Sequence, residues 1–71
     1  MARLRLANRL RVARAEVGWS QETLARKVGV TRQTIGAIET GQFGPSALLA
    51  FLIARRLGWR VDELFYLEGD S

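Results

Sequence analysis

The sequence predicts a single all-α domain over residues 1–71, folded as a compact bundle of about five short helices. Three observations predict this class: apolar residues recur at spacings of three and four, Gly stands at four of the breaks between these segments, and no run alternates with period two. A hydrophobic share of 48% is typical of a globular chain, and 71 residues have room for one domain.

The first helix is expected from about Arg3 to Val17, because Leu6, Leu10, Ala13 and Val17 recur at helical spacing. Gly18 is expected to end it, and Ser20 is a suitable N-cap for the second helix. The second helix is predicted to carry Leu24, Ala25 and Val28 inward and to end at Gly29. The third follows the cap Thr31, carries Ile35 and Ile38 inward and stops at Gly41. The fourth is predicted from about Ser46 to Leu57, ended by Gly58, and a last turn from Val61 to Phe65.

Charge is distributed unevenly along the chain, although the net charge is only +4. Residues 1–35 hold eight basic and two acidic side chains, which gives +6, and the remainder sums to −2. A basic half joined to a mildly acidic half indicates that one face meets a polyanion, for which nucleic acid is the obvious candidate. Arginines scattered over the surface of a soluble basic protein are the alternative.

The composition also excludes several function classes. The chain has no Cys and no His, so it lacks disulfides, thiolate nucleophiles, imidazole bases and the commonest zinc ligands. We therefore expect no enzyme activity, no cofactor and no metal. The Arg-rich opening "MARLRLANRLR" is interpreted as part of the fold rather than as a transit peptide, and no apolar run approaches the roughly 20 residues that span a bilayer. A cytoplasmic protein is expected.

The stretch "VGVTRQTIGAIETG", Val28 to Gly41, contains the residues that point to a function. Only about three residues separate the second and third helices, which predicts a steep crossing of the helix-turn-helix kind with Gly29 as the left-handed turn residue. Arg32 and Gln33 then stand in the first turn of the third helix. Arg can donate two hydrogen bonds to guanine and Gln can pair with adenine, so both can read base edges.

The run "RLRVARAEVGWSQETLARKVGVTRQTIGAIETGQFGPS", with "LGWRVDELF", resembles the Cro/phage-repressor (XRE) type of helix-turn-helix over about Arg9 to Phe65. The resemblance implies a lambda-repressor-like fold and a sequence-specific, dimeric transcriptional regulator of double-stranded DNA. It implies base contacts for Arg32, Gln33 and Ala37, and phosphate contacts for Gln21, Thr31, Thr34 and Thr40. Arg9, in the basic half of the chain, is also predicted to contact a phosphate. The resemblance also implies a structural ion pair between Arg14 and Glu39, which positions the third helix.

Gly36 interrupts the third helix at a cost of about 1 kcal/mol relative to Ala. Together with Ala37 it gives a low surface that can approach a groove wall, so we place it among the base-reading residues. A neutral surface position is the alternative for Gly36. Gln21 could likewise be a solvated residue of the first turn. Backbone amides at the N-termini of both helices are natural phosphate ligands.

The fourth helix departs from the family pattern, because "ALLAFLIA" is apolar on nearly every side. Leu49, Ile53 and Leu57 are expected to face the core, which leaves Leu48 and Leu52 as a second apolar stripe. We expect a homodimer through Leu48 and Leu52 together with Phe65 and Tyr66. The alternative is that one subunit buries both leucines in its own core.

Two functions fit these features. The first is a DNA-binding repressor, either complete or the first domain of a longer chain with an appended ligand-binding domain. The second is an antitoxin or controller protein that binds a protein partner and autoregulates its own promoter.

Overall fold

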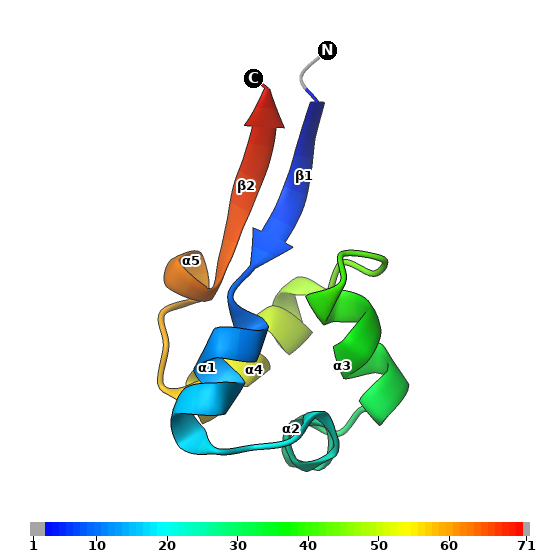
Figure 1. Ribbon diagram of the computed structural model, residues 1–71, viewed down its shortest axis with the longest axis vertical. Coiled ribbons are helices and arrows are strands. Elements are labelled where there is room, and N and C mark those ends of the chain that lie inside the picture. The colour runs from blue at the N-terminus through cyan, green and yellow to red at the C-terminus, as the bar shows by residue number, and fades with distance from the viewer. Residues whose placement is uncertain (1–2, 71) are drawn as a thin grey trace.

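The computed structural model describes residues 3–70 and contains a helical body with a two-stranded ribbon projecting from it (Figure 1). The elements in chain order are β1 (Arg3–Asn8), α1 (Leu10–Val17), α2 (Gln21–Val28), α3 (Arg32–Glu39), α4 (Ala47–Leu57), α5 (Val61–Leu64) and β2 (Phe65–Asp70). The five helices surround one core, and β1 and β2 run side by side away from it. The ribbon makes the molecule elongated, with extents of 37 × 21 × 20 Å.

Side-chain caps begin three of the helices at the positions that the sequence predicts. Ser20, Thr31 and Ser46 each accept a hydrogen bond from the backbone N–H three residues on, which satisfies a donor that the first helical turn leaves free. Gly29, with φ at +79°, ends α2 in the left-handed conformation that the short turn before α3 requires. The predicted bounds of these helices are therefore correct to within about one residue.

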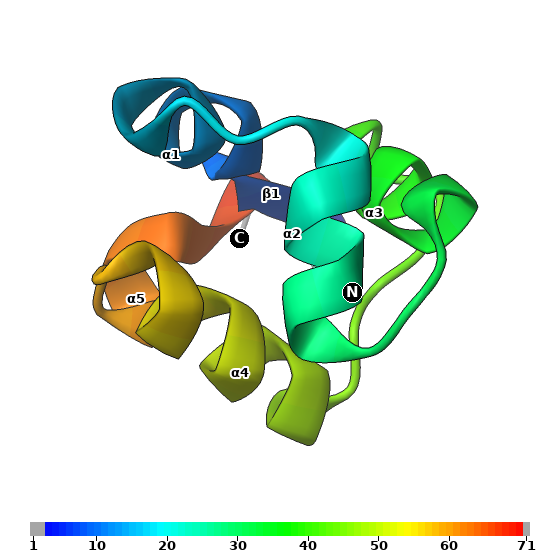
Figure 2. The same ribbon diagram turned by 90° about the horizontal axis from the view of Figure 1, so that it is seen from below.

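The core consists of apolar residues from every helix and the first residue of β2. Its largest fully buried side chains are Leu10, Leu24, Ile35, Ile38, Ile53 and Leu64. Val28 and Leu49, which were predicted to face inward, are half-buried and pack against this cluster. Seen from below, α2 and α3 cross steeply on one side of the body, with α1, α4 and α5 around the rest (Figure 2).

The prediction of an all-α fold is wrong at both ends of the chain. Residues 3–8 form a strand rather than the first two turns of α1, and residues 65–70 form its antiparallel partner. Leu6 and Val17, assigned to the inner face of a long first helix, are both exposed. The helical pattern of Leu6 and Leu10 was a coincidence of spacing, because Leu4 and Leu6 also alternate with Arg3 and Arg5 as a strand requires.

The base of the ribbon is tied to the body by hydrogen bonds. The Asn8 side chain accepts from the Leu10 N–H at 3.0 Å, at the start of α1, and it donates to the Ile38 carbonyl at 2.9 Å. The Arg9 N–H donates to the Leu64 carbonyl at 2.9 Å. These contacts fix the direction of the ribbon relative to the C-terminal end of α3.

Candidate nucleic-acid interface

The N-terminal turns of α2 and α3 form the candidate interface. Ser20 Oγ accepts from the Thr23 N–H at 3.0 Å, and Thr31 Oγ1 accepts from the Thr34 N–H at 3.2 Å. Arg32 and Gln33 are exposed in the first turn of α3. A helix N-terminus carries free N–H groups and a positive dipole end, so both turns favour an anionic partner.

The ion pair that the resemblance implies is present and holds α3 against α1. Arg14 Nε lies 2.6 Å from Glu39 Oε2, and Arg14 Nη2 donates to Glu39 Oε1 at 3.1 Å. The side chains are 14% and 1% exposed, so water screens this pair far less than a surface pair. Arg14 also donates to the Trp19 carbonyl at 2.9 Å, which fixes the loop before α2.

Gln21 extends this pair toward the exposed end of α3. Its Nε2 donates to Glu39 Oε1 at 3.0 Å, and its Oε1 accepts from Arg32 Nη1 at 3.2 Å. A continuous chain of hydrogen bonds therefore runs from Arg14 through Glu39 and Gln21 to Arg32. The side chain of Gln21 retains one free amide hydrogen, which is the donor available to a phosphate.

The charge of Glu39 is maintained by its neighbours. Burial disfavours the carboxylate, but hydrogen bonds from Arg14 and Gln21 and the charges of Arg14 and Arg11 outweigh this effect, so the pKa of Glu39 lies below its ordinary value. Arg11 Nε lies 3.9 Å from Glu39 Oε1 and is itself exposed. Glu39 therefore stays ionised at neutral pH, as the positioning of α3 requires.

Gly36 lies beside Gln21 of α2. It is half-buried, and an added Cβ would lie 3.7 Å from Gln21 Nε2. That distance is ordinary van der Waals contact, so the position does not require glycine. Gly36 allows the Gln21 amide to lie close to α3, and its predicted contact with bases stays a prediction. Ala37, its neighbour, is half-buried on α3.

The three threonines differ in what their hydroxyl groups can still do. Thr31 and Thr34 share a hydrogen bond of 3.0 Å between their Oγ1 atoms at the start of α3. The Thr40 hydroxyl donates to the carbonyls of Gly36 and Ala37 at 3.1 and 3.3 Å. A phosphate contact by Thr40 therefore requires its hydroxyl to rotate away from the helix, whereas Thr31 and Thr34 already lie at the exposed N-terminus.

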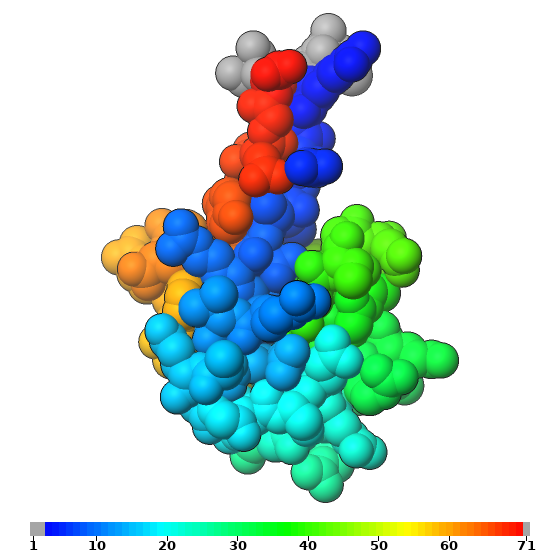
Figure 3. Space-filling view, in the orientation of Figure 1, coloured from blue at the N-terminus to red at the C-terminus, as the bar shows by residue number. Residues whose placement is uncertain are grey.

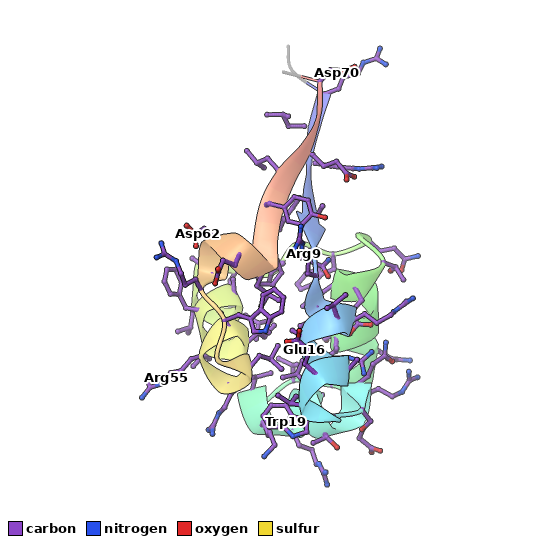
Figure 4. The ribbon with its side chains drawn as sticks, turned by 60° about the vertical axis from the view of Figure 1, so that its left-hand side comes forward. Arg9, Glu16, Trp19, Arg55, Asp62 and Asp70 are labelled. Atoms are coloured by element: carbon purple, nitrogen blue, oxygen red, sulfur yellow. The ribbon has the colours of Figure 1, made fainter. Side chains whose placement is uncertain are left out.

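Arg9 lies at the base of the ribbon (Figure 4), where its guanidinium stands over the Tyr66 ring at 5.8 Å from the centroid. This is a cation–π contact. The Arg9 side chain also lines a shallow pocket with Trp59, Asp62 and Glu63. Arg9 is exposed, and its predicted contact with a phosphate stays a prediction.

The predicted interface residues are divided between the core and the surface. Leu48 is 71% exposed and Leu52 is 36% exposed, so one subunit does not bury this stripe in its own core. Phe65 is 7% exposed and belongs to the core, so its predicted place in a dimer interface is wrong. Tyr66 is exposed on the ribbon, where Arg9 covers its ring.

Residues 3–70 contain no group of three or more acidic side chains placed to hold a metal ion. No helix among them has the length and apolar character needed to cross a bilayer. Two polar contacts of the site were missed from the sequence, those of Asn8 with Ile38 and of Gln21 with Glu39. Both join residues at least 18 positions apart, and no local pattern marks them.

Comparison with known proteins identifies the family. The helix-turn-helix family HTH_3 matches residues 10–64. A protein described as the uncharacterized HTH-type transcriptional regulator YgzD of Bacillus subtilis is 42% identical over 66 residues, which is 93% of this chain and 100% of that protein. A regulator of the same description from Methanothermobacter thermautotrophicus is 50% identical over 63 residues, covering 87% and 91% of the two chains.

Solved structures agree with this assignment. The restriction-modification controller protein C.AhdI of Aeromonas hydrophila is similar with a TM-score of 0.72 and 38% identity, over 78% of this chain and 80% of that one. A putative DNA-binding protein of Bacteroides fragilis matches with a TM-score of 0.77 and 25% identity, over 84% and 97%. The chain therefore belongs to the helix-turn-helix family of DNA-binding transcriptional regulators.

Proposed function

We propose that this protein is a sequence-specific repressor that binds double-stranded DNA as a homodimer, with α3 in the major groove and without a chemical step. One observation carries the proposal: Arg32 and Gln33 are exposed in the first turn of α3, while the chain Gln21–Glu39–Arg14 joins that turn to the body. A reading helix must be held rigidly to tell one base from another. The cytoplasm, where the protein would bind the chromosome, is the proposed setting.

Base reading is assigned to Arg32, Gln33 and Ala37. A guanidinium matches guanine O6 and N7, an amide matches adenine N6 and N7, and a methyl group can contact thymine. The hydrogen bond from Arg32 to Gln21 leaves further guanidinium donors for a base. Phosphate contacts are assigned to Gln21, Thr31 and Thr34, together with the backbone N–H groups beside them.

A homodimer is proposed because the DNA contact of one α3 is short. Two copies related by a two-fold axis would read an inverted repeat with half-sites about one helical turn, roughly 10 bp, apart. The sequence predicts an interface on the outer face of α4, and Leu48 and Leu52 are exposed there. The ribbon is a second candidate surface for the dimer.

A controller or antitoxin function is the second candidate. The similar protein from Aeromonas hydrophila is a restriction-modification controller, and the exposed face of α4, with Phe51 beside Leu48 and Leu52, would suit a protein partner. Copurification from the native host separates the two functions. A stoichiometric protein partner would favour the second, and recovery of the chain alone would favour the first.

Selection of binding sites from a random DNA pool tests the proposal. We expect inverted repeats, and affinity for them should fall steeply with salt because the basic half displaces counterions. Selection of no sequence, or affinity that salt leaves unchanged, would contradict specific binding through these arginines. Selection of single asymmetric sites would contradict binding as a two-fold dimer.

Three variants test the roles within the interface. Arg32→Ala should relax preference at one base position by roughly 1–3 kcal/mol, whereas Thr34→Ala should weaken binding to all sequences alike. Gln21→Ala should do both, because Gln21 also contacts Arg32. Equal losses on selected and random DNA for Arg32→Ala would show that α3 has been misassigned.

A further inference from the structure

The ribbon lacks the cover that such a structure needs. β1 and β2 form a sheet of two strands only, and within residues 3–70 no other strand lies beside either of them. The space-filling view shows them as a narrow projection from the body (Figure 3). A two-stranded ribbon is at best marginally stable in water, because its backbone hydrogen bonds face solvent and it has no core. Its open edges are also sites where another strand can add.

The two faces of the ribbon differ in chemistry. The register sets Leu6 opposite Leu67 and Leu4 opposite Gly69 on one face. The other face sets Arg5 opposite Glu68 and Arg3 opposite Asp70, and Arg5 Nη2 lies 2.8 Å from Glu68 Oε2. Because a slip of one residue would exchange the faces, these pairs fix the register. One face is therefore made for water, and the leucine face remains uncovered.

The hydrogen-bond pattern shows which backbone groups of β2 are free. The Arg9 N–H donates to the Leu64 carbonyl, so that pair is a hydrogen-bonded rung of the antiparallel ladder. Rungs alternate, which makes the Leu6 and Leu67 pair a rung without hydrogen bonds. The N–H and carbonyl of Leu67 therefore point away from β1, toward the outer edge of β2. The Phe65 N–H points the same way and donates to the Val61 carbonyl, as this alternation requires.

Charge distinguishes the two edges as sites for a second copy. Pairing of β1 with its own copy would place Arg3 opposite Arg5 when centred on Leu4, or Arg5 opposite Arg5 when centred on that residue. Centred on Leu6, it would place Arg3 opposite Arg9, the residue that follows the strand. Like charges directly opposite are destabilising in each case. Pairing of β2 with its own copy, centred on Leu67, places Glu68 opposite Tyr66 and no like charges opposite each other. It also places Leu67 opposite Leu67, where the outward N–H and carbonyl of each copy can bond to the other.

We infer that the outer edge of β2 pairs with the same edge of a second copy, antiparallel and centred on Leu67, to form a four-stranded sheet. The contact uses the same surface on both copies, as a two-fold dimer requires. It adds the missing strands and joins the leucine faces of two ribbons into one. The inference rests on the proposed dimer and assigns its interface to the ribbon.

The pairing would also set the positions of the two reading helices. The Asn8 side chain links the base of β1 to the Ile38 carbonyl near the end of α3. A sheet shared between two copies would therefore hold the two α3 helices at a fixed separation, as recognition of two half-sites demands. The Asn8 side chain therefore links the proposed dimer contact to the end of α3, beside the Arg9–Leu64 hydrogen bond and the buried Phe65 that also anchor the ribbon.

Amide hydrogen exchange provides the direct test, because the Leu67 N–H has no partner strand in a single subunit. We expect its exchange to be slow at high protein concentration and to become fast on dilution, while core amides such as that of Ile35 stay slow at both concentrations. Sedimentation measured alongside gives the dimer dissociation constant. A dimer in which the Leu67 amide exchanges rapidly at every concentration overturns the inference, and so does a chain that is monomeric at every concentration.

Three variants separate the edge from its side chains and from α4. Leu67→Pro removes the outward N–H, which the ribbon itself does not use, and should raise the dimer dissociation constant by roughly tenfold or more because two hydrogen bonds are lost. Leu67→Ala keeps that N–H and should raise the dimer dissociation constant only a few-fold. Leu48→Ser, at a similarly exposed leucine on α4, should leave it unchanged.

The opposite pattern, dissociation by Leu48→Ser and none by Leu67→Pro, would assign the dimer to α4. If Leu67→Pro unfolds the subunit, the exchange of the wild-type Leu67 amide still decides. Binding to selected DNA is measured separately on each protein. A dimer that dissociates as expected yet binds no DNA would overturn the proposed function and leave the interface intact.

Discussion

The helical body and the β1–β2 ribbon are stabilised by different interactions. In the body, capped helices bury Leu10, Leu24 and Ile35 completely, and the Glu39 carboxylate has three polar partners. In the ribbon, Leu4, Leu6 and Leu67 remain exposed, and its ion pair is solvated. The buried apolar side chains therefore lie almost entirely in the body, whereas the ribbon has little core of its own. Substitutions that remove the same number of atoms should therefore lower the free energy of unfolding by different amounts in the two regions.

The largest difference in the free energy of unfolding is expected between the variants Ile35→Ala and Leu4→Ala. Ile35 is fully buried, so its truncation leaves a cavity and should lower the free energy of unfolding by about 2–5 kcal/mol. Leu4 is exposed on the ribbon, and its truncation should cost less than about 1 kcal/mol. Urea denaturation at low protein concentration measures both. Equal losses would mean that the ribbon belongs to the core.

The next largest effect is expected for Glu39→Ala. Arg14 is only 14% exposed and would lose its partner, which should cost about 3 kcal/mol. Asp62→Ala is the control, because the pair of Arg60 and Asp62 is fully exposed and its loss should leave the melting temperature unchanged. If the two variants melt alike, the contact between Arg14 and Glu39 contributes no more than a surface pair.

Acid should remove part of this stability. Glu39 has a lowered pKa in the folded protein, so its contribution is fully present above the ordinary carboxylate pKa, given as 4.5. This contribution to stability is lost as the pH falls from 4.5 through the lower pKa of folded Glu39. The reason is that the unfolded chain then binds a proton at Glu39 more readily than the folded chain does. Thermal melting of the wild type and of Glu39→Gln across this range checks the sign. A wild type that loses no more stability than Glu39→Gln would show that other carboxylates govern acid unfolding.

A smaller effect, an increase in the free energy of unfolding, is expected for Gly36→Ala. The added methyl group would meet the Gln21 amide at ordinary contact distance, and Ala favours a helix over Gly by roughly 0.5–1 kcal/mol. The variant should therefore be more stable in urea, with the Arg14–Glu39 pair intact. A loss of stability would show that the Gln21 amide cannot accept a neighbour at that position.

The smallest effect on global stability is expected for Gly69→Ala, although it should be severe locally. Gly69 has φ at +125°, and a Cβ there would lie 2.1 Å from the Arg3 carbonyl oxygen. We expect the end of the ribbon to separate, seen as lost cross-strand contacts by NMR. The free energy of unfolding of the body should change by less than about 0.5 kcal/mol. If the body unfolds together with the ribbon in this variant, the two regions form one cooperative folding unit.

The helices and the reading residues were predictable because their signals are local. Ser20, Thr31 and Ser46 lie within three residues of the N–H groups that they cap, and Gly29 ends α2 at the position that its turn requires. Arg32 and Gln33 follow from the same spacing. The pair of Arg14 and Glu39 joins residues 25 positions apart and was implied only by the family resemblance.

The errors concern residues whose environment depends on distant parts of the chain. Phe65 was assigned to an interface because it is a large aromatic residue near the C-terminus, yet the end of α5 directs it into the core. Arg9 and Gly36 have neighbours that the sequence did not indicate: the Arg9 guanidinium lies over Tyr66, and Gly36 lies beside Gln21. Their predicted contacts with DNA stay predictions.

The sequence by itself determined the five helices, the crossing of α2 and α3 and the exposed first turn of α3, because caps, turns and apolar spacing act within a few residues. Tertiary structure alone decided that the two ends of the chain form strands. Each end has a backbone that can satisfy its hydrogen bonds as a helix or as a strand, and six residues carry too little pattern to choose. The choice is made only when α1 and α5 bring Asn8 opposite Phe65, so that each end supplies the other with its hydrogen-bond partners.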